Sequence, residues 1–170
     1  MLEGALRSGA LDLIIGATRQ LPADSSLHTE DLFEDELAVI CGASHPLASR
    51  ERLPVAEILD HGWVLPSRST PARQLFDRFL SQRGVAEPRQ VVETSSLSTT
   101  RGLLLESDRL ALLSTHQVQL DQAVGLLTTL PIKLEKTYRP IGITTRSGST
   151  PSPAARVFIE ALRTQTRTIE

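Results

Sequence analysis

Three short polar segments in this sequence are candidates for binding a small molecule, and each comes at the end of an apolar run. The three segments are Gly16, Ala17 and Thr18; Ser67, Arg68 and Ser69; and Thr94, Ser95 and Ser96. In open α/β sheets, ligands bind beyond the carboxyl ends of the strands, where helix N-termini present free N–H groups and a positive dipole end. Small hydroxyl-bearing residues at such places suit an anionic or polar molecule.

Each segment also has a simpler structural explanation. Ser and Thr residues directly before a helix commonly cap it and contribute about 1 kcal/mol each. This role fits Thr70 well, because Pro71 follows it. The Arg68 guanidinium could pair with a ligand carboxylate through its bidentate fork, or it could be an exposed loop arginine. Three such segments in one chain favour ligand contacts, and for Thr18 and Ser95 both alternatives stay open.

Catalytic chemistry at cysteine or histidine is less well supported. Cys41 ends an apolar run, where a buried small side chain is expected rather than a reactive thiolate. His45 precedes Pro46 and has no neighbouring Ser or Cys nucleophile, so we expect a turn residue rather than a catalytic base. Phosphate-loop, dinucleotide-binding and GxSxG patterns are absent. We therefore expect no enzyme, no catalytic residue and no cofactor.

A group of acidic residues could suggest a metal site, but its pattern argues against one. The group consists of Glu30, Asp31, Glu34, Asp35 and Glu36. Consecutive carboxylates on an extended chain point to opposite faces, so a solvated strand edge and loop explain them better. Asp12, within the run LDL, is expected to satisfy a local hydrogen bond. We predict no metal ligand.

Length and composition restrict the class of protein. The 170 residues have a formal net charge of −2 and a pI near 6.1, which is not the basic excess that binding to the DNA backbone requires. A single cysteine excludes an internal disulfide framework and a multi-cysteine metal site. No window approaches the roughly 20 apolar residues of a membrane span, and no signal peptide is evident. We expect a reduced, cytoplasmic domain without membrane contact.

Apolar runs alternate with helical patterns along the chain, which predicts an α/β fold. Strands are expected over residues 11–15, 37–41, 63–66, 89–94, 109–114, 126–132 and 138–146. Helices are expected before Gly9 and over residues 54–60, 70–84, 95–108, 115–125 and 152–169. This alternation is typical of a parallel sheet with right-handed crossovers, and the continuous apolar run at 11–15 predicts a strand buried on both faces. The inner face of the last helix is predicted to comprise Ala154, Val157, Phe158, Ala161 and Leu162.

Four segments of the chain resemble, in order, the effector-binding domain of LysR-type transcriptional regulators. They are LEGALRSGALDLIIG near the start, ELAVIC followed by HPLA (His45 to Ala48), WVLP at residues 63–66, and RLALLS at residues 109–114. The first two are the specific ones, whereas the last two would match many α/β proteins. The resemblance extends over essentially the whole sequence.

The resemblance implies a periplasmic-binding-protein-like fold of type 2, in which two Rossmann-like lobes hold an effector in a central cleft. Residues 1–59 and 138–170 would form lobe one, residues 60–132 lobe two, and residues 133–137 the crossover. Thr18 and the Thr94–Ser96 segment match positions that line the cleft in the family. The effector could be a sugar or an aromatic acid.

The resemblance also implies parts that lie outside this chain. A complete family member carries an N-terminal helix-turn-helix, a linker helix, and the first strand and helix of lobe one. DNA would be contacted only through that absent domain, and lobe one would be incomplete, with an exposed sheet neighbour. Self-association as a dimer or tetramer is expected of the full-length protein.

One function is favoured over two alternatives. The chain is expected to be the effector-sensing domain of a LysR-type regulator, binding a small anionic or polar metabolite and controlling DNA binding and transcription. The first alternative is a stand-alone solute-binding protein of the same fold, which the missing signal peptide weakens. The second is a small α/β enzyme that uses Cys41 or His45.

Overall fold

The computed structural model describes residues 2–18, 21–22, 25–135 and 137–167, which fold as two compact units. Unit 1 comprises Met1–Asp35 and Arg139–Glu170, and unit 2 comprises Glu36–Tyr138. The division therefore differs from the expected lobes, because residues 36–59 belong to unit 2 rather than to the first lobe. The physical reason is that the second half of the long strand β2 (Leu27–Gly42) pairs with strands of unit 2.

Unit 2 is built on a mixed sheet whose centre is parallel. Its other strands are β3 (Gly62–Leu65), β4 (Val91–Glu93), β5 (Arg109–Ser114) and β6 (Leu127–Thr129). Strand β3 pairs in parallel with both β4 and β5, as the strand–helix alternation predicts. Strand β2 runs antiparallel to β5 and to β6 and lies between them, so the sheet is not parallel throughout. The strand expected at residues 37–41 is therefore present, but its antiparallel pairing was not predicted.

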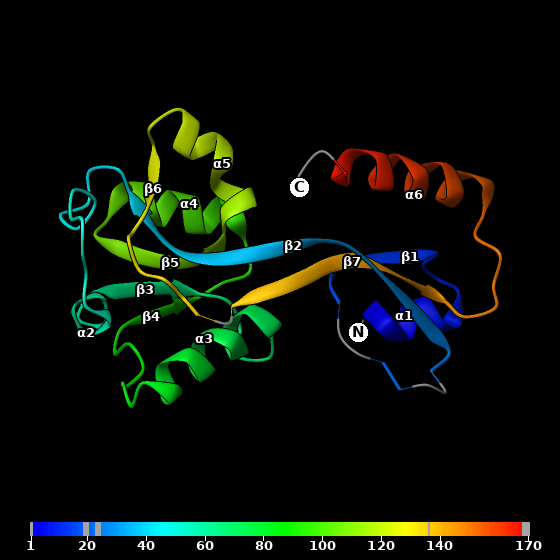
Figure 1. Cartoon of the computed structure of the whole chain (residues 1–170), viewed down its shortest axis with the longest axis horizontal. Coiled ribbons are helices and arrows are strands. Elements are labelled where there is room, and N and C mark those ends of the chain that lie inside the picture. Colours follow the sequence, from blue (N-terminus) through cyan, green and yellow to red (C-terminus); the bar gives the residue numbers. More distant parts are fainter. Residues whose placement is uncertain (1, 19–20, 23–24, 136, 168–170) are drawn as a thin grey trace. The chain divides into compact units, whose positions relative to one another are not determined.

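Helices cover both faces of the unit 2 sheet (Figure 1). They are α2 (Val55–Leu59), α3 (Pro71–Gln82), α4 (Leu97–Glu106) and α5 (Thr115–Ala123). Alternate β2 residues enter two separate cores: Val39 packs with Trp63 and Phe76 of one core, whereas Ile40 packs with Leu104 of the other. Residues 37–42 of β2 are consequently all buried, as an apolar strand covered on both faces requires.

Unit 1 has a smaller sheet. Its elements are α1 (Leu2–Ser8), β1 (Leu13–Ala17), β7 (Tyr138–Arg146), residues 27–35 of β2, and α6 (Pro153–Thr166). Gly9 ends α1 with a φ of 83°, as predicted from the sequence. Strand β7 lies between β1 and β2, and β1 pairs with it antiparallel from Leu13 to Ala17. The prediction that this strand is buried on both faces is wrong, because none of the residues Leu13–Ala17 is fully buried and Ile15 is 43% exposed.

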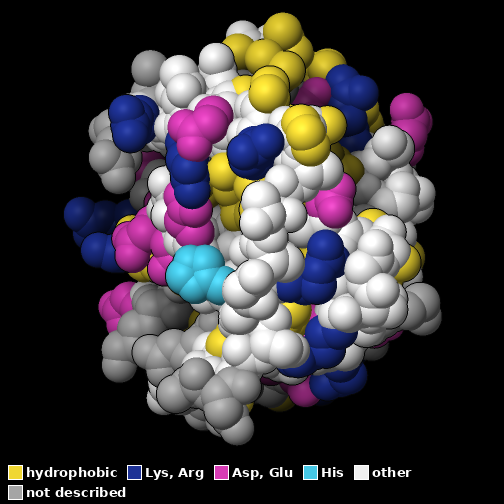
Figure 2. Space-filling view, turned by 90° about the vertical axis from the view of Figure 1, so that its right-hand side faces the viewer, with side chains coloured by type: hydrophobic (Ala, Val, Ile, Leu, Met, Phe, Trp, Pro, Cys, Tyr) yellow, Lys and Arg dark blue, Asp and Glu magenta, His cyan; other side chains and the backbone are white. Residues whose placement is uncertain are grey.

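The inner face of α6 is not the one that the sequence predicts. The residues that α6 buries are Ala155, Ile159 and Thr166, whereas Val157 is 72% and Phe158 48% exposed. Figure 2 shows hydrophobic side chains gathered at the top of this view. In this orientation Arg163 of α6 faces β2, where its Nε and Nη2 donate to both carboxylate oxygens of Glu30, at 2.7 and 2.6 Å.

His45 is a turn residue, as predicted, and it is buried. Its backbone N–H donates to the Gly42 carbonyl at 3.0 Å. The Leu47 N–H donates to Nδ1 at 3.0 Å, so the ring proton belongs on Nε2, which lies 3.3 Å from the Asp108 carbonyl oxygen. Burial lowers the pKa of His45 below its usual 6.5, and the neighbouring His61 ring adds to this effect. The folded protein therefore holds His45 neutral.

The orientation of α6 predicts different costs for two neighbouring truncations. Ile159→Ala should lower the free energy of unfolding by about 2–4 kcal/mol because it empties a buried site. Phe158→Ala should change it by less than about 1 kcal/mol because the ring is half exposed. Urea unfolding of both variants measures the difference. A larger loss from Phe158→Ala would mean that the sequence-based face is the inner one.

The neutral His45 predicts a loss of stability in acid. Because the pKa of His45 lies below 6.5 in the folded protein, the unfolded chain takes up a proton first as pH falls. The contribution of neutral His45 to the free energy of unfolding is therefore complete above pH 6.5 and is lost as pH falls toward the folded pKa. Urea unfolding at pH 7.5 and 5.5 should show that the free energy of unfolding falls more for the wild type than for His45→Asn. Equal pH dependence in both proteins would contradict the assignment.

Candidate functional site

In unit 2, parallel pairing brings two of the predicted polar segments to one sheet edge. Strands β3 and β4 are in register from Trp63 with Val91 to Leu65 with Glu93, so both end at the same edge. The Thr94 N–H donates to the Leu65 carbonyl at 3.1 Å and extends this pairing by one residue. The segments 67–69 and 94–96, far apart in the sequence, therefore both continue from this edge.

The segment after β4 forms the N-terminus of α4. Ser96 is the N-cap, and its hydroxyl accepts from the Thr99 N–H at 3.3 Å. The Thr94 hydroxyl accepts from the Ser96 N–H at 3.1 Å, which fixes the turn. Ser95 is exposed, and its side chain has no hydrogen bond to any residue that the structure describes. An α-helix leaves its first N–H groups without intrahelical acceptors, so this corner presents hydrogen-bond donors and the positive end of the helix dipole.

The segment after β3 is largely structural. Thr70 caps α3: its hydroxyl donates to the Ser67 carbonyl at 2.7 Å and accepts from the Arg73 N–H at 3.3 Å. The Ser67 and Ser69 hydroxyl oxygens lie 3.3 Å apart. The capping explanation offered for Thr70 is thus confirmed, and the two serines contribute hydroxyl groups beside it.

Arg68 is bound to a carboxylate of the chain itself. Its Nη1 and Nη2 donate to the two carboxylate oxygens of Glu87 at 3.0 and 2.5 Å. This pairing raises the pKa of Arg68 and lowers that of Glu87. Arg73, only 1% exposed, also donates to Glu87 at 3.1 Å and to Asp77 at 2.6 Å. A ligand carboxylate at Arg68 would have to displace Glu87. No sequence pattern points to this partner, because it lies in an irregular segment 19 residues away.

A third strand ends at the same edge and adds a residue that the sequence analysis did not single out. Strand β5 is parallel to β3, and its last residue, Ser114, is the N-cap of α5. Ser114 and Gln117 form a capping box, whose side-chain spacing S-x-x-Q is a recognisable signal. Ser114 is buried, so its role here is to fix the strand-to-helix turn.

In unit 1, the predicted residues lie at the carboxyl end of β1. Gly16 and Ala17 are the last two residues of the strand and pair with Gly142 and Ile141 of β7. Thr18 follows, and its N–H donates to the Pro140 carbonyl at 2.9 Å. Gly16 and Ala17 therefore offer mainly backbone, whereas Thr18 is the side chain with hydrogen-bonding capacity.

The remaining cysteine and acidic candidates are accounted for by packing and pairing. Cys41 is buried, and burial raises its pKa to about 11, so a thiolate is disfavoured. Asp35 is buried and accepts two hydrogen bonds from Arg139, which corrects its expected place on a solvated edge. Asp12 accepts from the Ser152 hydroxyl at 3.1 Å, a distant residue rather than a local partner. Among the described residues, no group of His, Cys, Asp or Glu could hold a metal ion.

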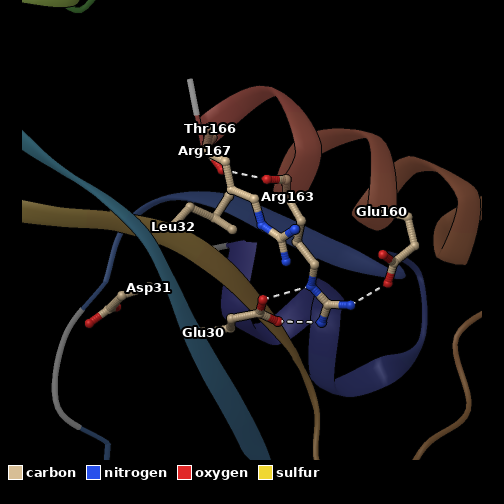
Figure 3. Close-up of a pocket in the computed structure, with 7 residues that line it drawn as sticks. All are labelled: Glu30, Asp31, Leu32, Glu160, Arg163, Thr166 and Arg167. Atoms are coloured by element: carbon tan, nitrogen blue, oxygen red, sulfur yellow. Dashed lines mark hydrogen bonds and ion pairs between the residues drawn. The ribbon is translucent and has the colours of Figure 1, made fainter. Parts of the chain in front are cut away.

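A hollow of about 380 Å³ in unit 1 contains none of the predicted site residues. It is lined by Glu30, Asp31, Leu32, Glu160, Arg163, Thr166 and Arg167 (Figure 3). Arg163 is paired with Glu30 and with Glu160, so its charge is already compensated. The hollow is therefore a salt-bridged surface between α6 and β2 and is not the candidate site.

The described helices also bear on membrane contact. None of the helices in the described ranges is both long and apolar enough to cross a bilayer.

The ion pairs of Glu87 with Arg68 and Arg73 predict that removing Glu87 and removing Arg68 destabilise the protein unequally. Glu87→Ala should lower the free energy of unfolding by about 1–3 kcal/mol, because it takes a partner from the buried Arg73. Arg68→Ala, the matched control, removes an exposed pair and should cost less than about 1 kcal/mol. Chemical unfolding of the two variants checks this order. An equal loss would mean that Glu87 acts only as the surface partner of Arg68.

The sequence matches one protein family almost completely. The family model of the LysR substrate binding domain matches residues 1–167. A similar relative is the HTH-type transcriptional regulator GalR of Pseudomonas putida, which is 39% identical over 163 residues, covering 96% of this chain and 41% of the relative. The chain spans about half the length of the relatives it matches, or less.

Solved structures share the fold at low sequence identity. The CcmR regulatory domain of Synechocystis in complex with 2-PG has a TM-score of 0.78 at 20% identity, covering 97% of this chain and 78% of that domain. The effector binding domain of QuiR in complex with shikimate has a TM-score of 0.75 at 17% identity, covering 98% of this chain and 77% of that domain.

Proposed function

Since the chain belongs to the LysR substrate binding domain family, with the type 2 periplasmic-binding-protein-like fold, we propose that it senses a small-molecule effector for a LysR-type transcriptional regulator. The relatives that it matches are transcriptional regulators rather than enzymes. Both the catalytic alternative and the stand-alone solute-binding protein lack a comparable observation in their favour.

One observation carries the proposal: hydroxyl-rich segments meet at the carboxyl edge of β3 and β4, beside the N-terminus of α4. The proposed ligand residues are Gly16, Ala17 and Thr18 in unit 1 and Ser67, Ser69, Thr94, Ser95 and Ser96 in unit 2. Arg68 contributes only if its pair with Glu87 opens. Free N–H groups and the dipole of α4 favour an anionic or polar group on the ligand.

The ligands of two similar structures support this class of effector. Those domains were solved with 2-PG and with shikimate, and shikimate is a hydroxylated carboxylate. A polar effector of this kind fits a corner made of hydroxyl groups and helix N–H groups better than an apolar one would.

The signal would be a shift between conformations. An effector changes an equilibrium only by its difference in affinity for the two states. Changing the ratio of the two conformations from 1:99 to 99:1 needs a difference in binding free energy of about 5.5 kcal/mol. A few hydrogen bonds would therefore give a graded response. The response would reach DNA through a helix-turn-helix outside this chain, in a dimer or tetramer of the full-length protein in the cytoplasm.

A thermal-shift screen tests the proposal on the chain itself. Shikimate, benzoate, galactose and sulfate form the starting panel, and any true ligand raises the melting temperature in a saturable way by mass action. Thr94→Val and Ser95→Ala should each weaken the response about tenfold, as loss of one hydrogen bond predicts. Ser81→Ala, at an exposed position of α3, is the control and should respond as the wild type does.

Two results would count against the proposed site. One is a panel in which no compound stabilises the wild type. The other is an equal response from the wild type, Ser95→Ala and Ser81→Ala, which would place the ligand away from the α4 corner.

A further inference from the structure

The chain passes between its two compact units twice, and both passages lie within strands. It leaves unit 1 after Asp35 of β2 and returns to it at Arg139 of β7. Both strands are labelled in Figure 1, and they are hydrogen-bonded neighbours in the sheet. From Leu37 onward, β2 pairs with β5 of unit 2. The covalent connection between the units therefore consists of the peptide bonds that follow residues 35 and 138.

A charged pair joins the two strands at the edge of unit 1. Arg139 donates from Nε and Nη2 to Asp35 Oδ2, at 2.8 and 2.7 Å. Asp35 is only 2% exposed. Hydrogen bonds between charged groups are stronger than neutral ones, and separating this pair would take the guanidinium from a buried carboxylate. The pair therefore opposes separation of β2 from β7 at this point.

A weaker contact joins the next residues, which belong to unit 2. The Tyr138 hydroxyl donates to Glu36 Oε1 at 3.2 Å, and Tyr138 is 51% exposed. Successive residues of a strand point to opposite faces, so this contact and the Asp35–Arg139 pair lie on opposite faces of the two strands. Water competes for an exposed hydrogen bond, so the Tyr138 contact holds the strands less firmly than the charged pair does.

Close packing at a glycine adds a second tie between β7 and β2 within unit 1. A Cβ added to Gly142 would collide with the Glu30 carbonyl oxygen and come within 2.9 Å of Asp31 Cα. The two strands are thus held together at Gly142 and again at Arg139. Bending of the connection is therefore confined to the residues beyond the charged pair, where the Tyr138 contact is the weaker tie.

We propose that the Asp35–Arg139 pair stiffens the connection between the units and thereby restricts the conformations among which an effector selects. The inference rests on the proposed function. The apparent dissociation constant of a ligand is its intrinsic value divided by the fraction of molecules that are competent to bind. Loss of the pair spreads the chain over more conformations and lowers that fraction. Asp35 and Arg139 are thus positioning residues, which change effector affinity without contacting the effector.

Distances between two spin labels, one in each unit, test the stiffening on the 170-residue chain without any effector. The labels are attached at Ser81→Cys on α3 and Thr164→Cys on α6, both exposed positions, whereas the native Cys41 is buried. Double electron–electron resonance should give a broader distance distribution for Asp35→Asn than for the labelled protein without this change. Glu34→Gln neutralises the exposed neighbouring carboxylate and is the matched control, which should leave the distribution unchanged.

Further variants separate the pair from its individual side chains. Arg139→Gln should broaden the distribution about as much as Asp35→Asn, and the double variant should broaden it no further, because the two side chains act as one interaction. Tyr138→Phe should broaden it less. The double variant holds no unpaired buried charge, so it keeps the test valid if a single variant fails to fold. Dispersed amide NMR spectra of all variants control for folding.

Calorimetric titration with shikimate relates the connection to effector binding. Asp35→Asn should bind shikimate about tenfold more weakly than Glu34→Gln does, which corresponds to the usual contribution of one hydrogen bond. Ser95→Ala should weaken binding without broadening the distance distribution, because Ser95 belongs to the proposed ligand site rather than to the connection.

The outcomes distinguish this inference from the proposed function. Equal distance distributions for the labelled parent, Asp35→Asn and the double variant overturn the inference, and so does a broader distribution with unchanged shikimate affinity. Both results leave the proposed function standing if binding still depends on Ser95. If no compound of the panel binds the wild type, the proposed function fails and the effect on effector selection fails with it, while the distance distributions still decide whether the pair stiffens the connection.

Discussion

Parallel pairing of β3 with both β4 and β5 is the constraint on which the organisation of unit 2 depends. Parallel neighbours end at the same edge, so the polar segments that follow them collect there in spite of their separation in sequence. The helices that return the chain must then cover opposite faces, which explains why β2 residues enter two different cores. A hydroxyl-rich edge with a helix N-terminus beside it follows from this topology.

Unit 1 reaches a polar corner by different means. Gly142 allows β7 and β2 to approach closely, and the Thr18 hydroxyl donates a hydrogen bond to Asp31. The α4 corner of unit 2 offers donors, whereas Thr18 offers an acceptor.

Features with a short-range signal could be predicted from the sequence, and features made by distant partners could not. Thr70 before Pro71 predicted the α3 cap. The inner face of α6 was predicted wrongly, because the helix carries apolar residues on two sides and its packing partners, such as Glu30 for Arg163, are 133 residues away in the sequence. For Arg68 a ligand carboxylate and an exposed loop position were both considered, but its pair with Glu87 was not, since Glu87 belongs to no sequence pattern.

The central claim is that a small polar molecule binds where the carboxyl ends of the strands meet the helix N-termini. Amide chemical-shift mapping by NMR during titration with shikimate tests this most directly. The account predicts saturable shifts concentrated at residues 94–99 and at Thr18. Shifts confined to the hollow between α6 and β2, or no saturable shifts at residues 94–99, would contradict it.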